Sequence, residues 1–201
     1  MIREEKLKEL ESYINEFKTI KDTNEGLVNK GFLSIEKHTC LLNNGKTIVR
    51  EKLIKNNKDG SACTILPITE EGNVILVVQP RVFSKLTVGI EFPAGYVEDD
   101  EAPSISAKRE LEEETGYTCN NMTLLAKYYQ DEGCSAAFNY CYLAPNCKKT
   151  KEQHLDNDEY IRYFECTFEE AVELLELGYI CGVNSTLALE KAKNYFKRNE
   201  D

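Results

Sequence analysis

The segment from Gly95 to Tyr117, GYVEDDEAPSISAKRELEEETGY, contains eight carboxylates and only two basic side chains. Glu110, Glu113 and Glu114 stand at positions i, i+3 and i+4, so a helix would place their carboxylates on one face, close to each other. A charge run usually forms a solvated helix face, but carboxylates at this spacing repel one another. We therefore expect a compensating cation, and hard oxygen ligands of this kind suit Mg²⁺ or Mn²⁺.

The flanking residues predict where this helix begins and ends. Asp99, Asp100 and Glu101 stand at its expected start, where negative charge meets the positive end of the helix dipole. Pro103 is acceptable in a first turn, and Gly116 is a natural stop. The three glutamates therefore fall in the second half of one helix, where a divalent ion would bridge them to phosphate oxygens of a substrate.

The rest of the chain predicts strands, then helices. Turn signals such as Asn44-Gly45, Asp59-Gly60 and Glu71-Gly72 separate segments rich in β-branched residues. We expect strands at 32–42, 47–55, 62–68, 74–78, 86–92, 122–129, 136–143 and 160–166. An amphipathic helix is expected from Ile2 to Phe17, before a polar stretch around residues 21–25, and further helices at 168–177 and 185–197. This order favours an α+β fold or a layered α/β/α sandwich.

Composition argues against several classes of function. The formal net charge of −10 argues against nonspecific binding to nucleic acid, because phosphates demand clustered Lys and Arg. No apolar run approaches the roughly 20 residues that a membrane span needs, and the N-terminal segment lacks the apolar core of a signal peptide. The eight cysteines are scattered without a C-x-x-C pair, which favours buried free thiols. We expect a cytoplasmic protein with no nucleic-acid or membrane partner.

The acidic segment resembles the signature of the Nudix hydrolases. The matching positions are Gly95, Glu101, Arg109-Glu110-Leu111, Glu113-Glu114 and Gly116. The final position, usually aliphatic, is Tyr117, a variant that the ADP-ribose pyrophosphatase branch of the family also uses. The stretches QPRVFSKLTVGIEFPAGYVE and TIVREKLIKNNKDGSACTILPI resemble the same branch, so the likeness covers roughly Thr47 to Lys193.

The resemblance implies an organisation in two parts. Residues 59–201 would form a Nudix hydrolase domain, a Nudix-type α/β/α sandwich with a mixed central sheet. Residues 1–58 would precede it as an N-terminal helix and antiparallel strands. The likeness to the family, together with the apolar stripe that begins at Ile2, predicts a homodimer formed through this region.

The resemblance also implies roles for the residues of the acidic segment. Metal ligation falls to Glu110, Glu114 and the carbonyl of Ala94, with Glu113 as a further ligand or as a proton acceptor. Arg109 and Glu101 would form an ion pair that orients the helix, with direct phosphate contact as the alternative for Arg109. Mg²⁺ is the implied cofactor, with Mn²⁺ as an alternative.

A catalytic carboxylate is expected on a second segment. In the resembling branch, a Glu on a mobile loop before the last strand activates or orients water. The stretch HLDNDEYIRYFE supplies Asp156, Asp158 and Glu159, and its Ile161-Arg162 matches the family segment that follows the loop. We choose Glu159, while the two aspartates and Glu113 stay open as alternatives.

Substrate recognition is the part that the resemblance defines least. Arg50 and Arg81 are the candidate cations for a diphosphate or a terminal ribose phosphate, with ordinary surface arginines as the alternative. Glu91 and Gly133 complete the implied substrate-binding set. Where the ADP-ribose branch commonly has a Pro before this glycine, the chain has Glu132, so the nucleotide and the sugar stay open.

The implied reaction is metal-dependent hydrolysis of the diphosphate linkage of ADP-ribose or a related nucleoside diphosphate sugar. The products would be a nucleoside monophosphate and a sugar phosphate. Two alternatives remain: the same chemistry on a nucleoside triphosphate or dinucleotide, and a noncatalytic nucleotide-sensing module. The intact glutamate trio favours catalysis.

Overall fold

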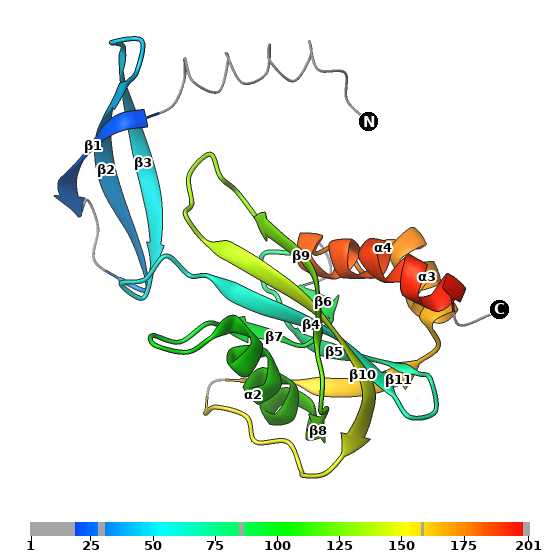
Figure 1. The fold of residues 1–201 in the computed structure, drawn as a ribbon. Helices are drawn as coiled ribbons and strands as arrows, with labels where there is room; N and C mark the ends of the chain where they lie inside the picture. The colour runs from blue at the N-terminus through cyan, green and yellow to red at the C-terminus, as the bar shows by residue number, and fades with distance from the viewer. Residues whose placement is uncertain (1–18, 28–30, 85–86, 158, 199–201) are drawn as a thin grey trace, which may run out of the picture. The chain divides into compact units, whose positions relative to one another are not determined.

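The computed structural model describes residues 19–27, 31–84, 87–157 and 159–198 (Figure 1). The chain divides into two compact units. The first comprises the residues up to Gly60 together with Asp131–Ala136, and the second comprises Ser61–Gln130 and Ala137–Asp201. The helix predicted between Ile2 and Phe17 lies outside the described residues. No described helix is both long and apolar enough to cross a membrane.

The first unit contains a three-stranded antiparallel sheet, ordered β1-β2-β3. Its strands are β1 (Thr19–Leu27), β2 (Leu33–Leu42) and β3 (Thr47–Lys55). The β2–β3 hairpin confirms the predicted turn, since Gly45 has a φ of 80° and its N–H donates to the Leu42 carbonyl. The polar stretch at residues 21–25 was not predicted to be a strand. It lacks apolar alternation but belongs to β1, because its backbone pairs with β2.

The second unit is built on a mixed eight-stranded sheet. Its strands are β4 (Ala62–Thr69), β5 (Val74–Pro80), β6 (Val88–Glu91), β7 (Ala94–Tyr96), β8 (Tyr117–Thr118), β9 (Thr123–Tyr129), β10 (Phe138–Lys149) and β11 (Arg162–Cys166). The main path runs β11-β5-β4-β10-β8, with β6 beside β5, β7 beside β4 and β9 beside β10. Strands β4 and β10 are parallel and the other pairs are antiparallel, so the predicted mixed sheet is confirmed.

Helices cover both faces of this sheet (Figure 1). On one face α2 (Pro103–Thr115) packs Ala107 and Leu111 against Cys63 and Ile65 of β4. The other face holds α3 (Phe168–Glu176) and α4 (Val183–Arg198), which bury a larger apolar cluster against β4, β5 and β10. The layered α/β/α sandwich is thereby confirmed.

Helix α2 begins later than predicted. Its first residue is Pro103, and the extended residue Ala102 is its N-cap. Asp100 has a φ of 64°, which is incompatible with a right-handed helix, and a residue before proline also avoids the helical region. The acidic run at residues 99–101 therefore precedes the helix, and no acidic side chain lies in the first turn.

Several other elements differ from the sequence patterns. Strands β7 and β8 were not predicted, because three and two residues are too short for a periodicity signal. Strand β10 runs to Lys149, beyond the predicted end at residue 143. A bulge near Asn146, whose φ is 55°, carries the strand past Pro145.

Candidate active site

Helix α2 buries carboxylates as well as apolar side chains. Ala107 and Leu111 on this helix are fully buried, which fixes its rotation against β4. The same rotation leaves Glu110 only 8% exposed and Glu114 only 2% exposed. A buried carboxylate is unfavourable unless it is paired or bound, and such groups concentrate at functional sites. This face of α2 is therefore the candidate active site.

Glu114 is held against the start of β7. The backbone N–H of Ala94 donates to Glu114 Oε2 at 3.0 Å. Burial nevertheless raises the pKa of this carboxyl well above its ordinary value, and the charges of Glu110 and Glu159 add to the effect. The structure thus brings Ala94 and Glu114 together. A positive charge placed nearby would strongly stabilise the ionised form of the Glu114 carboxyl.

Glu110 fills the space beside Gly95. A Cβ atom on Gly95 would lie 2.0 Å from Glu110 Cδ, so only glycine leaves room for this carboxylate. Burial raises the pKa of Glu110 to about 7, opposed by Arg109 and reinforced by the negative charges of Glu113 and Glu159. Glycine at position 95 is therefore a requirement of the carboxylate cluster.

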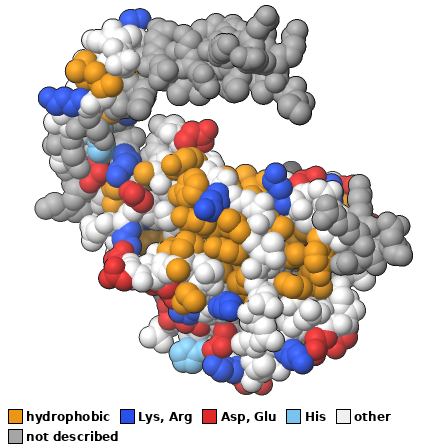
Figure 2. All heavy atoms as spheres, in the orientation of Figure 1, with side chains coloured by type: hydrophobic (Ala, Val, Ile, Leu, Met, Phe, Trp, Pro, Cys, Tyr) orange, Lys and Arg blue, Asp and Glu red, His pale blue; other side chains and the backbone are white. Residues whose placement is uncertain are grey.

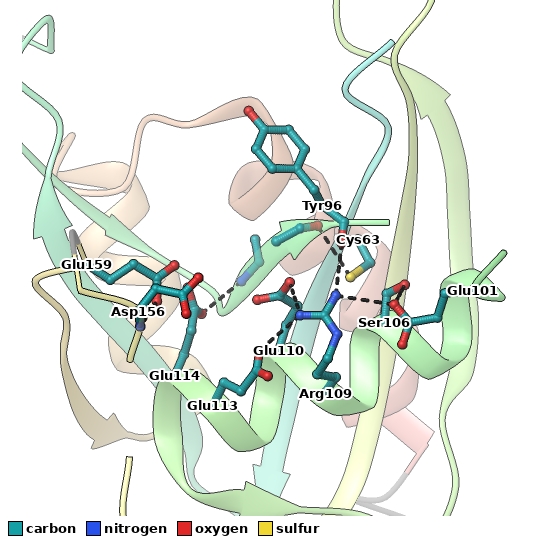
Figure 3. A network of polar contacts seen from close by, with 12 residues as sticks. Cys63, Tyr96, Glu101, Ser106, Arg109, Glu110, Glu113, Glu114, Asp156 and Glu159 are labelled. Atoms are coloured by element: carbon teal, nitrogen blue, oxygen red, sulfur yellow. Dashed lines mark hydrogen bonds and ion pairs between the residues drawn. The ribbon is translucent and has the colours of Figure 1, made fainter. Parts of the chain in front are cut away.

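Arg109 connects the carboxylates of the cluster (Figure 3). Its Nη1 donates to Glu110 Oε1 at 2.7 Å and to Glu113 Oε2 at 2.9 Å. Its Nη2 donates to the Tyr96 carbonyl at 3.2 Å and lies 3.3 Å from Glu101 Oε2. Burial opposes the guanidinium charge, but the adjacent carboxylates raise the pKa of Arg109 overall. The arginine therefore compensates part of the negative charge and ties α2 to the preceding loop.

The predicted contact between Glu101 and Arg109 is present. Ser106 also donates to Glu101 Oε2, at 2.7 Å. The Ser106 hydrogen bond and the Arg109 charge lower the pKa of Glu101 below its ordinary value. Glu101 therefore stays ionised and holds the guanidinium from the side opposite the buried carboxylates, which is the geometry an orienting ion pair requires.

The acidic loop before β11 is anchored to the end of α2. The His154 N–H donates to the Glu113 carbonyl at 2.9 Å, and Gln153 Nε2 donates to the Glu114 carbonyl. Within the loop, the Asp156 N–H donates to Glu159 Oε2 at 3.1 Å. Figure 3 shows Asp156 and Glu159 on the Glu114 side of the cluster. The structure therefore brings Glu159 to the site, while Asp158 lies outside the described residues.

Arg81, which follows β5, and Glu91, the last residue of β6, form a bidentate ion pair. Arg81 Nε lies 2.9 Å from Glu91 Oε1, and Nη2 lies 2.9 Å from Oε2. A Cβ atom on Gly89 would lie 2.0 Å from Glu91 Oε1, so glycine is needed here too. The hydrogen bonds that Arg81 donates to Glu91 raise the pKa of Arg81, and the charge of Glu114 contributes to the rise. The positive charge of Arg81 therefore interacts with the buried carboxyl of Glu114.

A cavity of about 480 Å³ adjoins this ion pair. Its walls include Arg81 and Glu91, the apolar side chains of Val82, Phe83 and Val88, and Tyr179 from the α3–α4 connection. Phe83 is fully exposed. A cavity of this size, apolar on one side and ionic on the other, is typical of small-ligand sites.

Two predicted substrate residues belong to the first unit, so the structure does not place them relative to the glutamate site. Arg50 lies on β3, where its Nη1 donates to the Val49 carbonyl at 2.8 Å. Gly133 lies in the Asp131–Ala136 segment, beside Glu132. Their assignment to the substrate stays a prediction.

The donor set fits a hard divalent cation. Among the described residues, no group of three His, Cys, Asp or Glu side chains forms a ready-made metal site, and Arg109 Nη1 lies between Glu110 and Glu113. However, Glu110 and Glu114 are buried oxygen ligands whose pKa values are raised by burial. A divalent ion offsets that penalty, and Mg²⁺ or Mn²⁺ is the class of ion that carboxylates prefer.

Several residues of the site were missed by the sequence analysis. Ser106 and Gln153 act through hydrogen bonds to Glu101 and to the end of α2, and neither belongs to a charge pattern. Phe83 and Tyr179 line the same cavity from segments nearly 100 residues apart in sequence. Among these four residues, only Phe83 had a signal in the sequence, because it is an aromatic residue two positions after the candidate cation Arg81.

The fold and the site define a class of protein, and comparison with protein families gives the same class. The model of the NUDIX domain matches residues 58–181. The chain therefore belongs to the Nudix family.

The chain is also similar in sequence to individual proteins of known name. The chain is 35% identical to the ADP-ribose pyrophosphatase of Bacillus subtilis over 150 residues, covering 74% of this chain and 78% of the relative. It is 32% identical to the methanol dehydrogenase activator of Bacillus methanolicus, with the same coverage of both chains. The ADP-sugar pyrophosphatase of Mus musculus is 38% identical over 47% of each chain.

A solved structure shares the fold. The crystal structure of an ADP compounds hydrolase superposes with a TM-score of 0.74, covering 90% of this chain and 97% of that one, at 21% sequence identity. This likeness supports the architecture over nearly the whole chain.

Proposed function

We propose that this protein hydrolyses the diphosphate linkage of ADP-ribose or a related nucleoside diphosphate sugar, giving a nucleoside monophosphate and a sugar phosphate. The observation that carries the proposal is the pair of buried carboxylates, Glu110 and Glu114, on a Nudix helix. Relatives named ADP-ribose pyrophosphatase, ADP-sugar pyrophosphatase and GDP-mannose pyrophosphatase support this substrate class.

A divalent cation, Mg²⁺ or Mn²⁺, is the proposed cofactor. Glu110, Glu113, Glu114 and the carbonyl of Ala94 would hold it. When bound, it supplies positive charge that screens the two phosphates of the substrate. For Glu110 and Glu113 to serve as ligands, Arg109 must give up or share the hydrogen bonds that it now makes to both.

The chain's own residues then have separate tasks. Glu159 lies on the Glu114 side of the cluster (Figure 3), where it orients the attacking water or accepts its proton, with Glu113 as the alternative acceptor. Arg109 and Glu101 keep α2 in place against the β7 loop. Water attacks one phosphorus in line, and the other phosphate leaves with its sugar or nucleoside.

Substrate binding is assigned to the cavity beside the ion pair. Arg81 would bind the diphosphate, and Glu91 fixes the position of its guanidinium. Phe83 and Tyr179 offer apolar and aromatic surface for a base or sugar ring. Arg50 and Gly133 of the first unit are proposed to complete recognition of the substrate.

We further propose a cytoplasmic homodimer. All eight cysteines are free, which suits a reducing compartment. The first unit exposes the large apolar side chains Ile20, Phe32, Leu33 and Val49, and Figure 2 shows hydrophobic side chains at its surface. Such a surface suits burial against a second copy. Light scattering at micromolar concentration tests this, and a monomer there contradicts it.

The reaction is tested by mass spectrometry of the products formed in ¹⁸O-labelled water with Mg²⁺. The substrate panel contains ADP-ribose, other nucleoside diphosphate sugars, a dinucleotide and a nucleoside triphosphate. We expect a nucleoside monophosphate and a sugar phosphate, with the label in one of them. Release of inorganic phosphate or diphosphate from the triphosphate alone would contradict the proposed substrate class.

A further inference from the structure

Two of the free cysteines face each other across neighbouring strands. Strands β8 and β10 are antiparallel, with Tyr117 opposite Lys149 and Thr118 opposite Lys148. Continuing this register by one residue places Cys119 opposite Cys147. The Thr150 N–H donates to the Gly116 carbonyl at 3.0 Å, which marks that pair as hydrogen-bonded. Because hydrogen-bonded and non-hydrogen-bonded pairs alternate, Cys119 and Cys147 occupy a non-hydrogen-bonded pair, where side chains approach most closely.

The side chains of these cysteines meet on the buried face of the ladder. Both belong to the apolar cluster beneath α2, in which Cys147 is 2% exposed and Cys119 is partly exposed. The Cys147 S–H donates to the Ala144 carbonyl at 3.0 Å, and Cys119 is near enough to interact with the same sulfur. A close antiparallel pair has a Cα separation of about 4.5 Å, which lies within the range that a disulfide bridges.

The surroundings make the two thiols unequal. The neighbouring Cys147 thiol, aided by the positive charge of Lys108, lowers the pKa of Cys119 despite its partial burial. Interaction with Cys119, together with burial, raises the pKa of Cys147. Cys119 is therefore the partly accessible, thiolate-forming partner, and Cys147 is the thiol placed to attack it after oxidation.

We propose that Cys119 and Cys147 form an oxidisable dithiol that closes to an intramolecular disulfide when the protein meets a hydroperoxide. The Cys119 thiolate attacks one peroxide oxygen, the O–O bond breaks, and a sulfenic acid forms with release of water or an alcohol. The Cys147 sulfur then attacks the Cys119 sulfur, the S–O bond breaks, and a second water leaves. Two thiols lose two electrons and two protons in total, and the peroxide is reduced.

The disulfide would link the segment that follows α2 to strand β10. Lys108 Nζ on α2 already donates to the Asn120 carbonyl at 3.0 Å, so this segment lies back along the helix. The bond would join it to β10 and close the loop of the unfolded chain between the two cysteines. Because the strand register places the two cysteines opposite each other, closure requires little backbone movement. We therefore expect a higher Tm and an unchanged kcat in the oxidised protein.

The test uses the full chain carrying Cys134→Ser and Cys181→Ser, which removes the two exposed thiols and thus intermolecular crosslinks. This protein is treated with a small excess of hydrogen peroxide, alkylated, digested without reductant and mapped by mass spectrometry. We expect a linked peptide pair joining Cys119 and Cys147, a raised Tm and full reversal by dithiothreitol. Adding Cys119→Ser to this background should abolish the linked peptide and the Tm shift.

Other outcomes overturn the proposal. If Cys119 and Cys147 are both alkylated fully after peroxide treatment of the folded protein, they do not pair. If the linked peptides join Cys119 or Cys147 to other cysteines, the pairing is wrong. A linked pair formed only after denaturation would show that the folded chain holds the sulfurs apart. None of these results depends on which substrate the enzyme hydrolyses.

Discussion

The replacement Glu110→Gln measures how much the buried charge of this carboxylate changes the free energy of unfolding. Burial raises the pKa of Glu110 to about 7 from the ordinary 4.5. At about 1.4 kcal/mol for each tenfold change in proton affinity, this corresponds to about 3 kcal/mol. A neutral glutamine of nearly the same shape removes that charge. Without divalent metal, we expect the variant to be more stable than the wild type at pH 8, by up to about 3 kcal/mol.

The pH dependence gives the sign of the effect. The folded-state pKa is higher than the unfolded one, so the folded wild type binds more protons between pH 4.5 and 7. The contribution of the Glu110 carboxyl to the stability of the folded state is complete below about pH 4.5 and is lost as the pH rises through about 7. The difference in unfolding free energy between Glu110→Gln and wild type should therefore be small near pH 4 and reach its maximum above pH 7.

Urea unfolding in EDTA between pH 4 and 8 measures this difference. Glu113→Gln is the control on the same helix, because its side chain is 37% exposed, and we expect a smaller change in stability than for Glu110→Gln. Adding Mg²⁺ should stabilise the wild type more than Glu110→Gln. A Glu110→Gln protein that is less stable than wild type at pH 8 in EDTA would refute the claim that burial of this charge opposes folding.

Three further replacements test the site. Glu114→Gln should fold normally but lose about a hundredfold or more in kcat, the scale of losing one preorganised electrostatic contact; steady-state assays and circular dichroism measure both. Gly95→Ala places a Cβ 2.0 Å from Glu110 Cδ, so we expect a loss of about 1–3 kcal/mol in urea unfolding and a loss of turnover. Phe83→Ala should raise KM about tenfold, equivalent to about 1.4 kcal/mol of lost contact, without changing stability, because this side chain is fully exposed.

Each of these replacements has a control and a contradicting result. Gly182→Ala should be nearly neutral, because a Cβ there meets no atom within 4 Å; equal destabilisation by Gly95→Ala and Gly182→Ala would count against the close packing. Val183→Ala is the control for Phe83, since it is exposed and does not line the cavity. Undiminished turnover by Glu114→Gln would overturn the role of that carboxylate.

Much of the helix that carries the site was predictable because its signal is local. The spacing of Glu110, Glu113 and Glu114 required one helical face, and Gly116 marked the stop correctly, with a φ of 73°. The contact between Arg109 and Glu101 followed from the resemblance to the family. Such features depend on residues within about one turn of each other or on fixed motif spacing.

Features that depend on distant residues were not predictable. The pKa values of Glu110 and Glu114 are set mainly by how deeply the surrounding strands bury them. The spacing of the glutamates along α2 does not reveal this burial. The cavity joins Phe83 to Tyr179 through the tertiary fold. Strand β1 was missed because its polar sequence carries no alternation, and only its pairing with β2 defines it.

The central claim is that the buried carboxylates of α2 bind a divalent cation together with a diphosphate. Calorimetric titration of Mg²⁺ into the protein, in the presence of a nonhydrolysable ADP-ribose analogue, tests it most directly. We predict saturable binding by the wild type and its loss in the double variant Glu110→Gln, Glu114→Gln. The same heat and stoichiometry in both proteins would contradict the account.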